Sequence, residues 1–215
     1  MTRYYGKYRL LICILISILP FNRWRIFFYN LLFNYKISQS SRIGLFTIIM
    51  AKNVRIDDSE IASFNFIRGP FDLEIEQNVK IGPSNKIECG TWILEDKFRD
   101  SGYLASCRLR KNSLITDAHF LDVTGGFELG EYSWIAGRGS QFWTHGAGAK
   151  DRSIRIGKHC YIGTAARFAP GAAIADNVTV SLGSVVTDKF SQNNCLLGGI
   201  PAKVIMENYI SPTGQ

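Results

Sequence analysis

The chain has 215 residues, of which 46% are apolar, 13% aromatic and 20% charged. This length suits one domain with a sizeable core, and the composition excludes a disordered, collagen-like or proline-rich chain. The formal net charge of +7 would suit a nucleic-acid-binding protein only if it were spread over the whole chain.

The excess positive charge lies at the N-terminus. Residues 1–56 hold nine of the 25 Lys and Arg residues and none of the 18 Asp and Glu residues. The rest of the chain is therefore nearly neutral, so we expect no nucleic-acid partner. A basic and apolar N-terminus instead favours contact with an anionic membrane surface.

Two short apolar runs occupy this basic segment. LLICILISIL covers 10–19, IFFYNLLF covers 26–33, and Pro20 between them predicts a break between two helices. Neither run spans a bilayer alone, and one continuous span would bury Arg23 and Arg25. We therefore expect residues 1–36 to form a helical hairpin at the membrane interface, on the inner face of the cytoplasmic membrane.

Two alternatives compete with this membrane hairpin. A signal peptide would have the same charged and apolar start, but SILPFN offers no small-residue cleavage site. A hairpin that only covers one end of the domain stays open. The five cysteines form no CxxC pair, which is typical of reduced structural cysteines in the cytoplasm.

From residue 37 onward, apolar residues recur at every sixth position. The most regular stretch is 156–187, where positions 156, 162, 168, 174, 180 and 186 are Ile, Ile, Phe, Ile, Val and Val. Neither helical nor simple strand periodicity gives this spacing. Earlier traces of the same period are Ile37, Ile43 and Ile49, then Ile75, Ile81, Ile87 and Ile93, then Val123, Leu129 and Ile135.

The residue sizes explain what this period builds. A bulky residue at every sixth position fills a narrow prism, and a small residue after it lets the chain turn a corner. A second small residue at the fifth position also points inward, where space is limited. Three such strands make one coil of about 18 residues, and the coils stack like neighbouring strands of a parallel sheet. The sequence thus predicts an all-β parallel solenoid over 37–205, followed by a tail at 206–215. We expect loops to leave its corners where the period slips, near 54–61, 95–122 and 142–153.

Two segments resemble a known family. IGKHCYIGTAARFAPGAAIADNVTVSLGSVVT at 156–187 and GGIPAKVI at 198–205 are similar to the repeats and closing motif of the hexapeptide-repeat acyltransferases. The resemblance implies a left-handed parallel β-helix, acetyl-CoA as acyl donor and a homotrimer with active sites between subunits. Among these enzymes the chain looks most like the sugar O-acetyltransferases of surface-polysaccharide assembly.

The resemblance also implies a catalytic histidine. His145 lies in QFWTHGAGAKDRS, where the family's sugar acetyltransferases carry their general base. A sugar hydroxyl is a weak nucleophile, so it needs a base with a pKa near neutrality as it attacks a thioester. We expect His119 and His159 to be packing or surface residues.

Several residues are candidates for the acceptor side of the site. Trp143 could form a wall for a sugar ring. Asp122, Glu131 and Asp117 could orient the histidine or position the acceptor, and their spacing selects none of them.

The cofactor candidates rest on the resemblance, which places CoA in a groove beside the last coils, between two subunits. Small residues there would let the pantetheine arm approach the backbone, an aromatic residue would pack beside it, and basic residues would reach its phosphates. The candidates are Gly163, Ala165, Ala166, Ser181, Tyr161, Lys189 and Lys203, with Arg167 as a further basic residue. We expect no metal, because the histidine triad of the γ-class carbonic anhydrases, which share the fold, is absent from the sequence.

The leading hypothesis is therefore an acetyl-CoA-dependent O-acetyltransferase of a surface-polysaccharide sugar or its lipid-linked precursor. One alternative is N-acylation of an amino sugar or another small acceptor. Another is a non-catalytic β-helix that serves as a membrane-associated scaffold.

Overall fold

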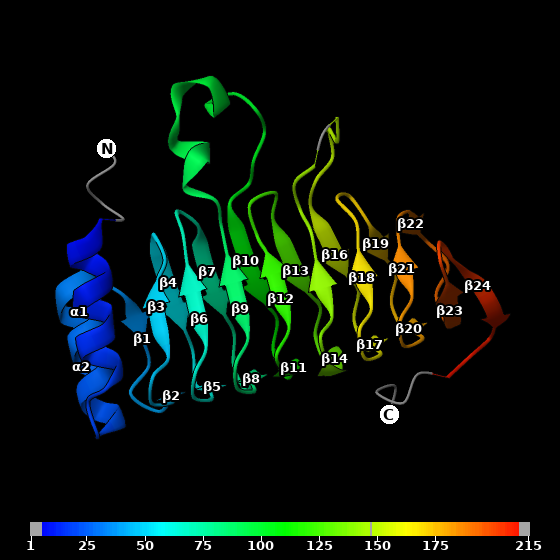
Figure 1. Ribbon diagram of the computed structural model, residues 1–215. Helices are drawn as coiled ribbons and strands as arrows, with labels where there is room; N and C mark the ends of the chain where they lie inside the picture. Colours follow the sequence, from blue (N-terminus) through cyan, green and yellow to red (C-terminus); the bar gives the residue numbers. More distant parts are fainter. Residues whose placement is uncertain (1–5, 147, 211–215) are drawn as a thin grey trace.

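The structure is a computed structural model, and it describes residues 6–146 and 148–210. Two helices come first, α1 (Lys7–Ser17) and α2 (Asn22–Phe33), and short strands then wind into three sheets (Figure 1). The first residues of the predicted hairpin, 1–5, and the end of the predicted tail, 211–215, lie outside the described residues.

As far as residue 199, successive strands visit the three sheets in turn, so each strand pairs in parallel with the strand one coil away. The last strand, β24 (Ala202–Glu207), instead turns back and pairs antiparallel with the strand before it, β23 (Cys195–Gly199). Sheet A contains β1 (Lys36–Ile37), β4 (Asn53–Ile56), β7 (Asp72–Ile75), β10 (Ser106–Leu109), β13 (Phe127–Leu129), β16 (Ile154–Ile156), β19 (Ala173–Ile174) and β22 (Lys189–Phe190). Sheet B contains β2 (Arg42–Ile43), β5 (Glu60–Ile61), β8 (Lys80–Ile81), β11 (Leu114–Asp117), β14 (Trp134–Arg138), β17 (Tyr161–Ile162), β20 (Thr179–Val180), β23 (Cys195–Gly199) and β24 (Ala202–Glu207). Sheet C contains β3 (Ile48–Met50), β6 (Phe66–Arg68), β9 (Lys86–Glu88), β12 (Phe120–Asp122), β15 (Gln141–Phe142), β18 (Arg167–Phe168) and β21 (Val185–Val186).

The residues of the six-residue period form the interior of this prism. All six apolar positions of the 156–187 stretch are at most 4% exposed, and so are the corresponding positions from Ile37 onward, apart from Ile93. The small residues at the fifth position also point inward, since Cys160, Ala166 and Ala172 are fully buried. The predicted parallel solenoid is therefore confirmed. Ile93 is the exception because it lies in a short 3₁₀ helix, η2 (Thr91–Leu94), outside the coils.

Two long excursions interrupt the coils, and both leave the corner between sheets C and A (Figure 1). Ile162 pairs with Val180, 18 positions later, in a regular coil. By contrast, Asp72 pairs with Ser106 across the excursion 90–105, which carries η2 and η3 (Asp96–Phe98). Phe127 pairs with Ile154 across the second excursion, 143–153.

The expected loops are thus only partly correct. The excursion predicted near 142–153 is present, but that predicted over 95–122 is too wide, because residues 106–122 form regular strands β10 to β12. No loop leaves at 54–61, where β4 and β5 are regular. The period slips there because Ile37 pairs with Ile56, 19 positions later, so that one additional residue in the turn before Ile56 shifts the frame.

The helical hairpin covers the open end of the first coil. Cys13, Ile16, Ile26 and Tyr29 are buried against it. Polar side chains of α2 pair with the exposed strand edges of the coil: Asn22 Nδ2 donates to Ser41 O at 2.8 Å, and Asn22 Oδ1 accepts from Ile43 N at 2.9 Å. The hairpin is therefore a structural cap of the solenoid, which is the alternative that the sequence left open beside membrane contact.

The outer side of the same hairpin is apolar and exposed. The side chains on it with about half or more of their surface exposed include Leu11, Leu15, Phe21, Trp24, Phe27, Leu31 and Leu32. In the part of the chain that the structure describes, neither helix is long and apolar enough to cross a bilayer.

Candidate functional site

His145 lies at the corner between sheets C and A, three residues after the end of β15. Its Nδ1 atom is 2.7 Å from Oδ2 of Asp122, the last residue of β12. An ionised carboxylate only accepts hydrogen bonds, so Nδ1 carries the ring proton and Nε2 keeps its lone pair. This arrangement leaves the imidazole ready to accept a proton from a bound molecule.

The carboxylate of Asp122 is held rigidly by four further hydrogen bonds. Its Oδ1 accepts from Thr124 N at 3.1 Å and from Thr124 Oγ1 at 2.6 Å. Its Oδ2 accepts from Thr144 N at 2.7 Å and from Thr144 Oγ1 at 2.8 Å. Because Asp122 is only 3% exposed, these donors stabilise a carboxylate that burial would otherwise disfavour. Asp122 thus orients the imidazole, which is one of the two roles that the sequence left open.

A cleft of about 320 Å³ opens beside this pair. Its floor is the outer face of sheet C, and η2 forms one wall. The lining residues are Arg68, Glu88, Cys89, Gly90, Thr91, Trp92, Phe120, Asp122 and His145. The volume falls in the range of small-molecule sites.

Trp92 packs edge-on against the imidazole, with 5.7 Å between the ring centres. Trp92 also contacts Phe98 at 4.7 Å and Tyr103 at 5.0 Å, so the excursion 90–105 has its own aromatic core. Gly90 makes this packing possible, because a Cβ there would lie 2.1 Å from Nε1 of Trp92. Trp92 was not among the predicted site residues, because the six-residue period continues in the sequence to Ile93, whereas the structure places Trp92 in η2, outside the coils.

The two excursions also hold each other. Arg152 Nη1 donates to Ser101 O at 2.7 Å, and its guanidinium lies 4.3 Å from the centre of the Tyr103 ring. This contact ties the segment that carries His145 to the segment that carries Trp92. The cleft is therefore shaped by two loops that are far apart in sequence.

Trp143 does lie near the candidate base, as the sequence predicted. Its ring centre is 6.2 Å from that of His145 and 4.7 Å from that of Phe120. Phe120 lines the cleft. Trp143 thus lies beside the imidazole and can offer an apolar wall.

The cleft also contains a thiol. Burial raises the pKa of Cys89 to about 12, so this group stays a thiol at neutral pH and is a poor nucleophile. His145 is therefore the group in the cleft best suited to proton transfer.

The other two histidines have structural surroundings. His119 is buried, its Nδ1 accepts from Ser140 N at 3.1 Å, and burial lowers its pKa to about 4. His159 stacks on Tyr132 with 4.9 Å between ring centres, in a turn between sheets A and B. Neither histidine lines the cleft beside His145.

Two acidic candidates lie away from the cleft. Glu131 is at the corner between sheets A and B, where its carboxylate is 3.3 Å from Nζ of Lys158. The expectation that Glu131 binds the acceptor beside His145 is therefore not supported within one chain, because the two occupy different corners of the prism. Asp117 pairs with Arg138 at 2.8 Å.

The cofactor candidates do not gather around His145 either. Gly163, Ala165 and Ser181 lie in turns at the corner between sheets B and C, and Tyr161 lies on sheet B. The side chain of Ala166 is fully buried in the prism, so it cannot line a groove, because the fifth position of a hexad points inward.

The basic candidates are likewise scattered. Lys189 projects from sheet A and pairs with Asp151 at 2.5 Å, Lys203 is exposed on β24, and Arg167 is exposed on β18. Gly163 has a structural role of its own, since a Cβ there would lie 2.7 Å from the backbone nitrogen of Leu182.

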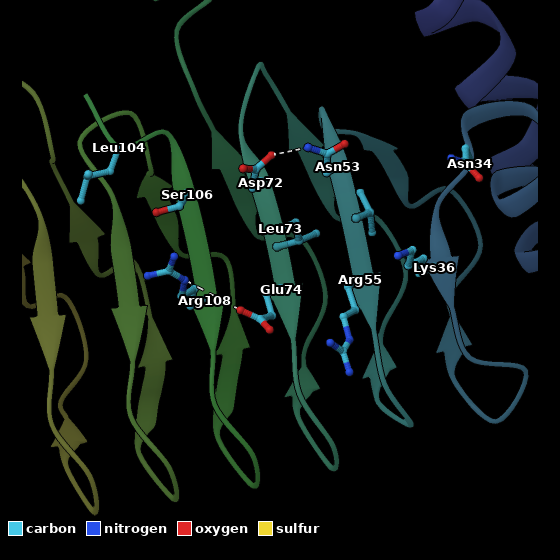
Figure 2. Close-up of a pocket in the computed structure, with 11 residues that line it drawn as sticks. Asn34, Lys36, Asn53, Arg55, Asp72, Leu73, Glu74, Leu104, Ser106 and Arg108 are labelled. Carbon is cyan, nitrogen blue, oxygen red and sulfur yellow. Dashed lines mark hydrogen bonds and ion pairs between the residues drawn. The ribbon is translucent and has the colours of Figure 1, made fainter. Parts of the chain in front are cut away.

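A larger cavity of about 610 Å³ lies on the outer face of sheet A. Figure 2 shows that its strands carry Asn53, Asp72, Glu74 and Arg108, which pair with one another: Asn53 donates to Asp72 at 2.7 Å, and Arg108 lies 3.8 Å from Glu74. No histidine or cysteine lines it. The smaller cleft on sheet C is therefore the better candidate for chemistry.

Nothing in the described residues suggests a metal centre. Across 6–146 and 148–210, no three His, Cys, Asp or Glu side chains come together in a way that could hold a metal ion.

Several solved structures have a fold similar to that of this chain. No family model matches the chain. The solved polysialic acid O-acetyltransferase OatWY is similar with a TM-score of 0.57 and 20% identity, over 82% of this chain and 85% of that one. LpxA from Acinetobacter baumannii has a TM-score of 0.57 and 15% identity over 81% of this chain and 70% of its own. A hexapeptide-repeat acetyltransferase from Vibrio cholerae, VCA0836, has a TM-score of 0.51 and 15% identity over 96% and 92%.

These likenesses confirm the fold that the sequence predicted, including its left-handed sense. They are too distant in sequence to carry an activity with them. The structural neighbours of this chain are hexapeptide-repeat acetyltransferases, and it shares their left-handed parallel β-helix.

Proposed function

We propose that this protein is an acetyl-CoA-dependent O-acetyltransferase that acts on a sugar hydroxyl of a surface polysaccharide or of its lipid-linked precursor. The observation that carries the proposal is the hydrogen bond between His145 and the buried Asp122 beside a cleft. The fold shared with a polysialic acid O-acetyltransferase supports a sugar hydroxyl as acceptor.

In the proposed reaction, His145 and Asp122 support a direct transfer. Nε2 of His145 removes the proton of the acceptor hydroxyl while the oxygen attacks the thioester carbonyl. A C–O bond forms, the C–S bond breaks, and the CoA thiolate leaves and takes the proton from the imidazolium. Asp122 stabilises the positive charge that the ring carries between these events, and base catalysis of this kind is typically worth about 10²- to 10⁴-fold in rate.

The proposed donor site needs more than one copy of the chain. His145 lies at the corner between sheets C and A, whereas Gly163, Ala165 and Ser181 lie at the corner between sheets B and C. A homotrimer in which one copy turns the B–C corner toward its neighbour's cleft would join the two. Exposed apolar side chains on and around sheet B support such an interface, namely Tyr132, Trp134, Leu182 and Met206.

The proposed place of action is a membrane surface. The hairpin presents Leu15, Trp24, Phe27 and Leu31 outward, all about half exposed or more. A contiguous apolar face of this kind, in a segment without any acidic residue before Asp57, suits the headgroup region of an anionic bilayer. We place the protein on the cytoplasmic face, where a polyprenyl-linked acceptor would be available.

A thiol-release assay with acetyl-CoA and a panel of glycans tests the proposal. The expected result is acceptor-dependent release of CoA and an acetyl ester that mild base removes. A base-stable acetyl amide would instead establish N-acylation. Absence of CoA binding by calorimetry, together with absence of release, would favour the scaffold.

A further inference from the structure

One basic and two acidic side chains form a row along the floor of the cleft. In register, Arg68 of β6 pairs with Glu88 of β9, and Glu88 pairs with Asp122 of β12. All three line the cleft. Neighbouring strands of a sheet are about 4.8 Å apart, so Arg68 lies about 10 Å along the floor from the residue that orients His145.

Arg68 is half-buried, yet no described side chain pairs with its guanidinium. Elsewhere the same geometry does produce ion pairs. Arg108 and Glu74 are also in register on neighbouring strands and lie 3.8 Å apart, whereas no ion pair joins Arg68 to Glu88 in the part of the chain that the structure describes. The charged groups of Arg68 and Glu88 are therefore both left available to a molecule in the cleft.

The charges around Arg68 restrict what this molecule can be. One guanidinium binds one carboxylate through two parallel hydrogen bonds. Glu88 beside it accepts hydrogen bonds, which suits neighbouring hydroxyl groups. The carboxylates of Glu88 and Asp122 in the same row repel a multiply charged phosphate more strongly than a singly charged carboxylate, so the row favours the carboxylate.

We propose that Arg68 binds the carboxylate of an acidic sugar in the acceptor, with Glu88 accepting hydrogen bonds from hydroxyls of the same glycan. This inference rests on the proposed function and narrows its substrate class. The spacing of about two strands puts the carboxylate on the sugar that receives the acetyl group or on the next one. Trp92 in the facing wall offers an apolar surface for the sugar ring.

The test compares three full-length proteins: the wild type, the Arg68→Gln variant and the Arg55→Gln variant. Arg55→Gln is the matched control. Arg55 projects from sheet A, where it pairs with Asp57 at 2.9 Å, away from the cleft. The probes are oligosialic acid and oligogalacturonate, each with its carboxyl-reduced counterpart. Binding by calorimetry and the KM values for each acceptor and for acetyl-CoA are measured with all three proteins.

We expect the wild type and Arg55→Gln to bind at least one acidic glycan about tenfold or more tightly than its reduced form, and Arg68→Gln to lose this preference. KM for acetyl-CoA stays unchanged. The inference is wrong if the wild type prefers no acid, if Arg68→Gln weakens the acidic and reduced glycans equally, or if it raises only KM for acetyl-CoA.

The binding measurement separates this inference from the proposed activity. If no acetyl transfer occurs but Arg68→Gln abolishes the preference for acidic glycans, the acid subsite stands and the O-acetyltransferase proposal fails. If transfer occurs equally well to acidic and reduced glycans, the activity stands and the acid subsite fails.

Discussion

The imidazole of His145 and the carboxylate of Asp122, 23 positions apart in sequence, are joined by a 2.7 Å hydrogen bond because β12 and β15 are neighbours in sheet C. One coil separates them along the chain, and the stacking of coils brings them together. The same carboxylate is fixed by Thr124 and Thr144, so it cannot turn away from the ring.

Asp122→Asn should therefore lower kcat by about 10- to 10³-fold, because an amide no longer selects the Nδ1–H tautomer or stabilises the imidazolium. Stability should fall by about 1–3 kcal/mol, since the amide NH₂ would face the N–H donors of Thr124 and Thr144. Steady-state kinetics and urea unfolding measure both effects. Asp117→Asn, which alters an exposed ion pair on the same coil, is the control and should change neither.

Gly90→Ala tests the position of Trp92. The added Cβ would collide with the indole, so the ring has to leave the imidazole and the cleft loses one wall. We expect KM for the acceptor to rise about tenfold, with KM for acetyl-CoA little changed. Stability should change little, because this glycine belongs to the excursion and not to the prism. An unchanged acceptor KM would show that Trp92 is not part of the acceptor site.

His119 predicts a dependence of stability on pH. Burial lowers its pKa to about 4, from an ordinary value of 6.5, so the unfolded chain binds this proton more readily than the folded one. Stability should thus fall as the pH is lowered from 6.5 to 4, by at most about 3 kcal/mol from this group. His119→Gln should flatten that part of the profile in urea unfolding. His159→Asn should retain it, and loss of the slope in that variant would assign it to the wrong histidine.

The prism core predicts a graded loss of stability. Ile162 is fully buried in the prism, so Ile162→Val should cost about 0.5–1.5 kcal/mol and Ile162→Ala about 2–5 kcal/mol in denaturant unfolding. A loss below 0.5 kcal/mol for the alanine variant would contradict its place in the inward column.

Substitutions on the two faces of the hairpin should have different effects, on membrane binding for the outer face and on stability for the buried face. Trp24→Ser together with Leu31→Ser changes only the outer face and should reduce sedimentation with anionic lipid vesicles while leaving the unfolding midpoint nearly unchanged. Ile26→Ala changes the buried face and should lower stability by about 2–5 kcal/mol. Removal of the whole hairpin would uncover the first coil, so it is a poor test of membrane contact. Undiminished binding by the double serine variant would refute the membrane role.

The sequence predicted the solenoid because each hexad position has a distinct size requirement, and this requirement repeats. It made His145 a candidate base chiefly through resemblance to a family, and Trp143 a candidate sugar wall because it precedes His145 by two positions. It could not choose among Asp117, Asp122 and Glu131, because that choice depends on which corner of the prism each residue occupies. With the strands in register, Asp122 falls beside the segment of His145, whereas Glu131 falls at another corner.

Trp92 and Arg68 show a different limit of sequence reasoning. Trp92 lies in an excursion outside the coils, so its approach to His145 depends on the folding of residues 90–105. Arg68 occupies an ordinary outward position of a strand, and only the lack of a side-chain partner among the described residues distinguishes it. For the hairpin, the sequence offered membrane contact and capping of the domain as alternative roles. In the structure, the inner face of the hairpin caps the first coil and its outer face is exposed.

The most direct measurement of the central claim is acetyl transfer by His145→Ala, followed as CoA thiol release with a glycan acceptor. We predict a fall in kcat of about 10²- to 10⁴-fold with unfolding and CoA binding unchanged, while His159→Asn keeps wild-type activity. Wild-type turnover by His145→Ala would contradict the assignment of this imidazole as the base.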